Sequence, residues 1–222
     1  ERGTMLLTED ILLLATDDTS GRRLARYTDL LVAGGLLSDL AMAGNVRTTE
    51  PGESVRKNRV VAVPDAAWPA DSLLAEALTV ISRKPNWYLS TLVERLGHKL
   101  VDHKAVDVVY DRLAQAELVS RTPHRVLGLV PTTRWVSVDG RYEATLYEQL
   151  DAVFLFGATP DAHVASLAAL LTGSGLVASV IDRGRGVDKR AVKRRGKELL
   201  KQYWPAQAME RAFQNRDAAA AG

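Results

Sequence analysis

Apolar and polar positions alternate along this chain at spacings that mostly predict helices. Residues 7–14 form a short apolar run, and residues 24–43 form a longer one with leucines at helical spacing. Thr8 suits a helix start because its hydroxyl accepts from free amides, and Glu9 and Asp10 suit the positive end of the dipole. Residues 17–21 (DDTSG) are typical of a tight turn. The pattern therefore predicts a short capped helix, a turn and a long helix ending at Gly44-Asn45.

Two glycines interrupt the long predicted helix at Gly34 and Gly35. Each destabilises an exposed helix by about 1 kcal/mol relative to alanine. Their presence is better explained by another backbone that packs closely against this helix, and the sequence predicts such a contact.

The remaining pattern alternates between short strand signals and helices. Strands are expected at 46–50 and 59–63, and a hairpin at 120–138. Helices are expected at about 71–83, with Asp71 or Ser72 as the cap, and at 87–96, 102–116, 141–156, 161–172 and 187–213. This order predicts a mainly α protein, a compact single-domain helical bundle with a short N-terminal strand pair and a protruding central β-hairpin. Residues 5–213 form the domain, and residues 1–4 and 214–222 are expected to be disordered ends.

Composition narrows the setting of the protein. The 222 residues suffice for a large core, the net charge is only +2, and cysteine is absent, which excludes disulfides and cysteine metal sites. No apolar run approaches the ~20 residues needed to cross a bilayer. Residues 1–4 do not resemble the start of a signal peptide. We expect a cytoplasmic protein, with peripheral contact at the inner face of the membrane.

Catalytic chemistry is not visible in the sequence. The four histidines (His98, His103, His124 and His163) lack the spacing of metal ligands, and the glycine-rich stretches lack the spacing of nucleotide-binding loops. No serine stands in a nucleophile motif. We therefore predict no catalytic residue, no metal and no cofactor, and hence a protein that is not an enzyme.

Basic residues are densest between residues 182 and 201. A charge run of this kind is either a solvated helix face or a surface for phosphates, on lipid or nucleic acid. The residues predicted to face a membrane are Arg190, Lys193, Arg194, Arg195 and Lys197.

The order of motifs resembles the Golgi phosphoprotein 3 family. Residues 7–14 (LTEDILLL), 18–21 (DTSG) and 39–44 (DLAMAG) match the family's opening, and residues 86–87 (NW), 110–114 (YDRLA) and 193–200 (KRRGKELL) match later motifs. Frequent alanine, valine, arginine and aspartate indicate a GC-rich bacterial genome, such as an actinobacterial one. The resemblance implies the family's fold and a non-enzymatic peripheral membrane adaptor.

The family binds phosphatidylinositol 4-phosphate and holds protein tails, and its hairpin mediates self-association. The resemblance therefore implies an anionic, phosphoinositide-like phospholipid and protein partners here, and self-association through 120–138. It places Arg112 on the phosphate, but the family's second arginine falls on Val109, and its tryptophan and a further arginine fall near Leu24 and Ala33. The residues close enough to substitute for them are Arg22, Arg23, Arg26 and Tyr27.

Two alternatives accompany this interpretation. Arg112 is as well explained by an ion pair with Asp107, Asp111 or Glu117. Residues 73–138, three helices and a hairpin, also resemble a winged-helix nucleic-acid-binding domain, although the acidic residues of the third helix would repel phosphate and make nucleic acid an unfavourable partner. Trp135, on the hairpin, is expected to be exposed or to serve self-association.

Overall fold

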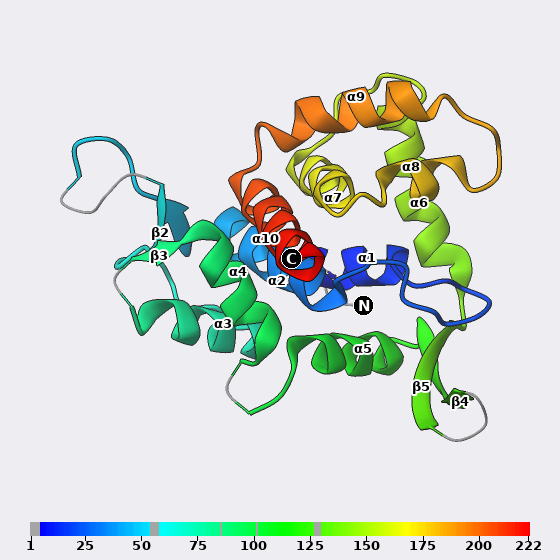
Figure 1. The fold of residues 1–222 in the computed structure, drawn as a ribbon, viewed down its shortest axis with the longest axis horizontal. Helices are drawn as coiled ribbons and strands as arrows, with labels where there is room; N and C mark the ends of the chain where they lie inside the picture. Colours follow the sequence, from blue (N-terminus) through cyan, green and yellow to red (C-terminus); the bar gives the residue numbers. More distant parts are fainter. Residues whose placement is uncertain (1–4, 54–57, 85, 101, 127–129) are drawn as a thin grey trace.

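The computed structural model describes residues 5–53, 58–84, 86–100, 102–126 and 130–222. Figure 1 shows helices around a central pair, with two small sheets at the edges. The helices are α1 (Leu7–Leu14), α2 (Thr28–Met42), α3 (Ser72–Ser82), α4 (Leu89–His98), α5 (Ala105–Gln115), α6 (Gly140–Phe154), α7 (Ala162–Gly173), α8 (Val177–Asp182), α9 (Lys189–Leu200) and α10 (Trp204–Ala221). The strands are β1 (Val46–Thr48), β2 (Arg59–Ala62), β3 (Trp87–Tyr88), β4 (Val119–Val126) and β5 (Val130–Ser137). The expected mainly α single domain is confirmed.

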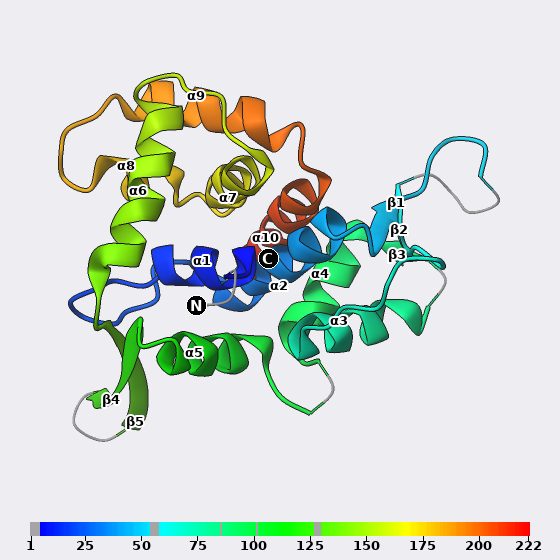
Figure 2. The same cartoon turned by 180° about the vertical axis from the view of Figure 1, so that it is seen from behind.

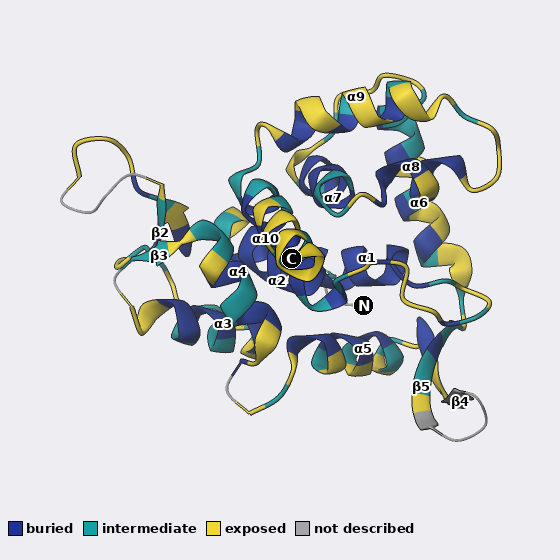
Figure 3. Ribbon diagram, viewed as in Figure 1, coloured by how far each residue is buried: buried dark blue, intermediate teal, exposed yellow. Residues whose placement is uncertain are grey.

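The core is built around α1 and α2. Helix α1 is buried along its whole length, and α2 packs against α1, α10, α4, α5 and α7. Figure 3 shows both helices almost entirely in the colour of buried residues. A helix covered on all sides carries apolar residues around most of its circumference, which explains the long leucine runs of the first 40 residues. The buried polar residues Thr8, Glu9, Asp10 and Asp39 are exceptions.

The two glycines of α2 lie where neighbouring elements come closest. A Cβ at Gly35 would lie 2.8 Å from the Cα of Thr8, and one at Gly34 would lie 3.0 Å from the Cβ of Met209 in α10. The predicted close backbone contact is therefore confirmed at Gly35, where α1 crosses α2. At Gly34 the neighbour is a side chain instead.

Two antiparallel sheets lie at the edges of the bundle. Strands β1, β2 and β3 form one in that order, and β4 and β5 form the hairpin, with Val119 opposite Ser137. Both project from the helices in the two opposite views (Figures 1 and 2). The third strand was not predicted. Trp87 was expected to begin a helix, but Trp87 and Tyr88 pair with β2, and α4 begins only at Leu89.

The C-terminal third differs most from the sequence expectation. The helix predicted over 187–213 is two helices, because Pro205, in the first turn of α10, would clash with a continuous helix. Helix α8 was not predicted. The expected disordered end at 214–222 is also wrong, since α10 continues to Ala221 and Arg216 forms ion pairs. The other expected disordered end, residues 1–4, lies outside the described residues. No described helix is long and apolar enough to span a bilayer.

Candidate functional site

The acidic residues at the start of α1 are held by partners on other helices. The Asp39 carboxylate on α2 accepts from the backbone amides of Leu7 and Thr8, at 2.9 and 3.0 Å, and from the Thr8 hydroxyl. Asp39 therefore caps α1 from a neighbouring helix. The prediction that Thr8 is the cap is wrong, because α1 begins at Leu7 and Thr8 lies inside it. Burial raises the pKa of Asp39 to about 6, although the hydrogen bonds from α1 favour its charged form.

Arg112 joins three helices through two carboxylates. Its Nε lies 2.6 Å from Glu9 Oε1 of α1, and its two terminal nitrogens lie 3.1 and 2.7 Å from the oxygens of Asp71. Asp71 also caps α3, since it accepts from the amides of Leu73 and Leu74. Burial acts to raise the pKa of Asp71, but the hydrogen bonds and charge of Arg112 hold it below its ordinary value.

This arrangement corrects the sequence expectation for Arg112. An ion pair is confirmed, but its partners are Glu9 and Asp71, not Asp107, Asp111 or Glu117. Carboxylates occupy both edges of the guanidinium. A phosphate would use these same donors, so it would have to displace Glu9 or Asp71. Arg112 therefore clamps α5 to α1 and α3.

Asp10 completes the set of anchored acids on α1. Its carboxylate accepts from the Tyr142 hydroxyl at 2.7 Å and lies 2.7 Å from His163 Nε2. The hydrogen bond and charge of Asp10 raise the pKa of His163. Residues 8–10, which belong to the opening motif of the sequence, therefore hold α1 against α2, α5, α6 and α7.

An open cleft of about 590 Å³ lies between the beginning of α2, the end of α4 and the beginning of α5. Its lining includes three basic side chains (Arg23, Arg26 and Lys104), the imidazole of His98, and two acidic side chains (Asp29 and Asp107). Gly97 brings the walls together, because a Cβ there would lie 2.9 Å from the carbonyl oxygen of Asp29. The cleft therefore unites two of the predicted phosphate ligands, Arg23 and Arg26, with residues that the sequence analysis did not select.

Two helices begin at this cleft without a side-chain cap. Tyr27 precedes α2 and Lys104 precedes α5, and neither side chain bonds the free amides of its helix. Residues in the first turn of each helix line the cleft, namely Thr28 and Asp29 in α2 and Val106 and Asp107 in α5. Free amides and the positive end of the helix dipole make such a position favourable for an anion.

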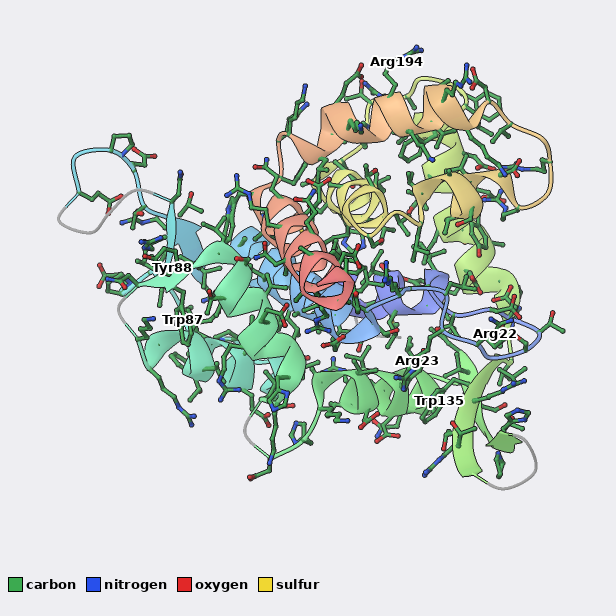
Figure 4. The ribbon with its side chains drawn as sticks, viewed as in Figure 1. Arg22, Arg23, Trp87, Tyr88, Trp135 and Arg194 are labelled. Atoms are coloured by element: carbon green, nitrogen blue, oxygen red, sulfur yellow. The ribbon has the colours of Figure 1, made fainter. Side chains whose placement is uncertain are left out.

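The basic side chains of the cleft are lightly held. Arg23 lies with its guanidinium 5.3 Å from the ring centre of Tyr110 and 4.0 Å from Asp107. Arg26 lies 2.9 Å from Asp217, with both side chains about half exposed. Lys104 is exposed and has no ion pair within the described part of the chain. The side chain of Arg23, from the segment before α2, lies beside α5 (Figure 4).

The other predicted ligands lie outside the cleft lining. The Tyr27 hydroxyl donates to Asp217 at 2.8 Å, and its ring packs edge-on against Phe213 of α10. Arg22 is exposed and lies in the segment between α1 and α2, on the side of the hairpin (Figure 4). Trp135 is buried and stacks on Tyr110 with ring centres 5.0 Å apart, so the expected exposure of Trp135 is wrong.

The basic cluster of 182–201 separates into paired and unpaired members. Arg183 and Arg185 both bind Asp151, Lys189 binds Asp182, and Arg195 lies 3.4 Å from Glu198. The unpaired members, as far as the described residues reach, are Arg190, Lys193, Arg194, Lys197 and Lys201. Four of the five predicted membrane-facing residues therefore share this set, and Arg195 does not.

Sequence reasoning did not select His98 and Lys104 as phosphate ligands. Lys104 fell inside the helix predicted over 102–116, whereas α5 begins only at Ala105, and nothing in the sequence placed His98 and Lys104 beside Arg23 and Arg26. Among the described residues there is no cluster of histidine, aspartate or glutamate able to hold a metal.

The family comparison agrees with this architecture. The family model described as Golgi phosphoprotein 3 (GPP34) matches residues 7–216, nearly the whole chain. No curated protein matches the chain.

Proposed function

The chain belongs to the Golgi phosphoprotein 3 family, and from this membership we propose that it is a non-enzymatic adaptor that binds the phosphate of an anionic phospholipid at a membrane surface. The binding site is the cleft between α2, α4 and α5. The observation that carries the proposal is that two uncapped helix N-termini and three basic side chains meet there.

Both acidic residues of the cleft have an arginine partner, so their charges do not prevent an anion from binding there. Asp29 is bound by Arg216, whose terminal nitrogen lies 2.8 and 2.9 Å from its two oxygens and which also pairs with Glu94. Asp107 lies 4.0 Å from Arg23. Arg26 is bound to Asp217 only at the surface, and exposed ion pairs contribute about 0–1 kcal/mol. Arg26 can therefore exchange Asp217 for a phosphate at little cost. Lys104 forms no ion pair with a carboxylate of the described residues, so no such contact has to break when it binds a phosphate.

The dimensions of the cleft fit a headgroup. Pockets for small ligands usually have volumes of roughly 300–1,000 Å³, and this cleft has about 590 Å³. Its lining is mostly polar, with Val106 and Ala25 as apolar exceptions. A phosphate on the helix N-termini is consistent with a headgroup in the cleft and acyl chains left in the bilayer.

Co-sedimentation with vesicles tests the proposal. The vesicles contain phosphatidylcholine alone, or phosphatidylcholine with either phosphatidylglycerol or phosphatidylinositol 4-phosphate. The wild type should pellet with the anionic vesicles, and the pair Arg26→Ala and Lys104→Ala should lose this binding. Arg83→Ala with Arg121→Ala is the matched control, because it removes the same charge from exposed residues outside the cleft. Equal pelleting with neutral and anionic vesicles, or equal loss in both double variants, would contradict the proposal.

The winged-helix alternative gains little support from the geometry. Helices α3 to α5 and the hairpin follow in the expected order, but β3 pairs with β2 and not with the hairpin. The exposed side of α5 carries Asp107 and Asp111, which oppose a phosphate backbone.

A further inference from the structure

Helix α9 carries a row of cations along one face. Arg190, Lys193, Arg194, Lys197 and Lys201 are all exposed, and their spacing places them within an arc of about 100° over roughly 16 Å. The opposite face buries Val192, Gly196, Leu199 and Leu200, largely against α7. Figure 3 shows the outer side of α9 as exposed, and Arg194 points away from the molecule in Figure 4.

Within the described residues, no carboxylate forms an ion pair with a member of this row. Like charges at i and i+4 destabilise a helix, and the row contains three such pairs, including Arg190 with Arg194 and Lys193 with Lys197. The neighbouring cations of this part of the chain, by contrast, are each matched to a carboxylate. The row therefore has charge available for a partner.

The surface over the row is hollowed. One hollow of about 520 Å³ is lined by the five cations and Glu198. A second, of about 340 Å³, shares Lys197 and Lys201 with it and extends over Leu200 to Gln207, Glu210 and Arg211 of α10. The two hollows share these lysines and together form a groove that runs along α9 and continues onto α10.

We propose that this groove binds an acidic segment of a partner protein, whose carboxylates meet successive cations of the row. A groove favours a peptide over a flat bilayer. The apolar residues of α9 are buried in the core, so the helix has no apolar side chains to insert into lipid. No aromatic side chain lines either hollow, which removes the stacking that single-stranded nucleic acid uses.

The position of α9 keeps this surface apart from the lipid cleft. Helices α9 and α5 lie at opposite edges of the molecule, with α7 and α1 between them, in both Figures 1 and 2. A bilayer that contacts the cleft beside α5 therefore leaves the groove free for a protein. The inference does not depend on lipid binding.

The test is fluorescence anisotropy with a labelled 14-residue peptide of Glu-Ala repeats, with a Gln-Ala peptide as the neutral probe. The wild type should bind the acidic peptide only, and more weakly as salt rises. Arg194→Glu with Lys197→Glu should weaken this binding about tenfold or more, since each reversal removes an attraction and adds a repulsion. Arg83→Glu with Arg121→Glu, which changes the net charge equally, should leave it near the wild-type value.

Vesicle and DNA binding of the same variants decide between occupants. The variant with Arg194→Glu and Lys197→Glu (the groove variant) should pellet with phosphatidylglycerol vesicles to the same extent as the wild type, whatever that extent is. Loss of pelleting in the groove variant, but not in the control, would overturn the proposal in favour of a membrane surface. Equal affinity for the two peptides, equal loss in both variants, or tighter binding of a single-stranded DNA of the same charge would also overturn it. Circular dichroism checks that both variants are folded.

Discussion

Replacing Arg112 with methionine separates the two roles that sequence and structure give this residue. As a clamp, Arg112 satisfies Glu9, whose side chain is 6% exposed, and Asp71, whose side chain is 25% exposed. Methionine keeps most of the apolar stem and removes the guanidinium. Both carboxylates then lose their cation, and Glu9 remains largely buried, with the Leu6 amide as its one remaining donor among the described residues.

The expected loss follows from these contacts. Removing one partner of a buried ion pair costs about 3–5 kcal/mol, and exposed pairs contribute about 0–1 kcal/mol. Arg112 is 26% exposed and its contact to Glu9 is mostly buried, so we expect Arg112→Met to lower the free energy of unfolding by about 2–4 kcal/mol. In a chain of this size each kcal/mol lowers Tm by about 2–4 °C, which gives a shift of roughly 4–16 °C.

Urea unfolding followed by circular dichroism measures this loss, with Arg121→Met on the exposed face of β4 as the control. The double variant Arg112→Met with Asp71→Asn should lose less free energy of unfolding than the sum of the losses of the two single variants, because both substitutions remove the same interaction. The pKa of Asp71 is lowered in the folded protein, so its contribution is present above the unfolded pKa of about 4 and disappears as pH falls through the folded value. A stability within about 0.5 kcal/mol of wild type, together with lost binding to anionic vesicles, would refute the clamp and restore Arg112 as a phosphate ligand.

Three further predictions concern packing and buried charge. Gly35→Ala should cost about 1–3 kcal/mol in urea unfolding, because its Cβ would lie 2.8 Å from the Thr8 backbone, while Gly140→Ala, with no atom within 4 Å, should be neutral or stabilising; equal effects would contradict the close contact. Burial raises the pKa of Glu143 to about 8, so the wild type loses stability as pH rises toward 8 and Glu143→Gln should become more stable relative to it. A difference in urea midpoint between the two proteins that stays constant with pH would contradict this. The pKa of His163 is raised by Asp10, so the loss caused by His163→Gln should be largest below about pH 6.5 and shrink as pH rises through the folded pKa; a loss that grows with pH would exclude the ion pair.

The sequence predicted those features that local chemistry determines. The apolar runs of 7–14 and 24–43 predicted two helices, and the structure forms them as α1 and α2, with all of α1 and most of α2 buried. Asp17 in the predicted turn accepts from the amide and hydroxyl of Ser20, as its side chain allows. Asp71 caps α3 as expected.

Features that depend on distant partners could not be predicted. The partners of Arg112 lie 41 and 103 residues away, and the tertiary fold brings them together by packing α5 against α1 and placing the cap residue of α3, Asp71, within reach of Arg112. The cleft likewise depends on the position of α5 relative to the start of α2, which no local pattern specifies. Pro205, by contrast, was a local signal for the end of one helix and the start of another, and the prediction of a single helix over 187–213 overlooked it.

The most direct test of the lipid cleft is a titration with short-chain, soluble dihexanoyl phosphatidylglycerol, followed by amide NMR. We predict that the amide shifts change most at 28–30 and 105–107, where α2 and α5 begin at the cleft, and that dihexanoyl phosphatidylcholine produces no such change. Changes that gather on α9 or on the hairpin, or equal changes with both lipids, would contradict phosphate binding in the cleft.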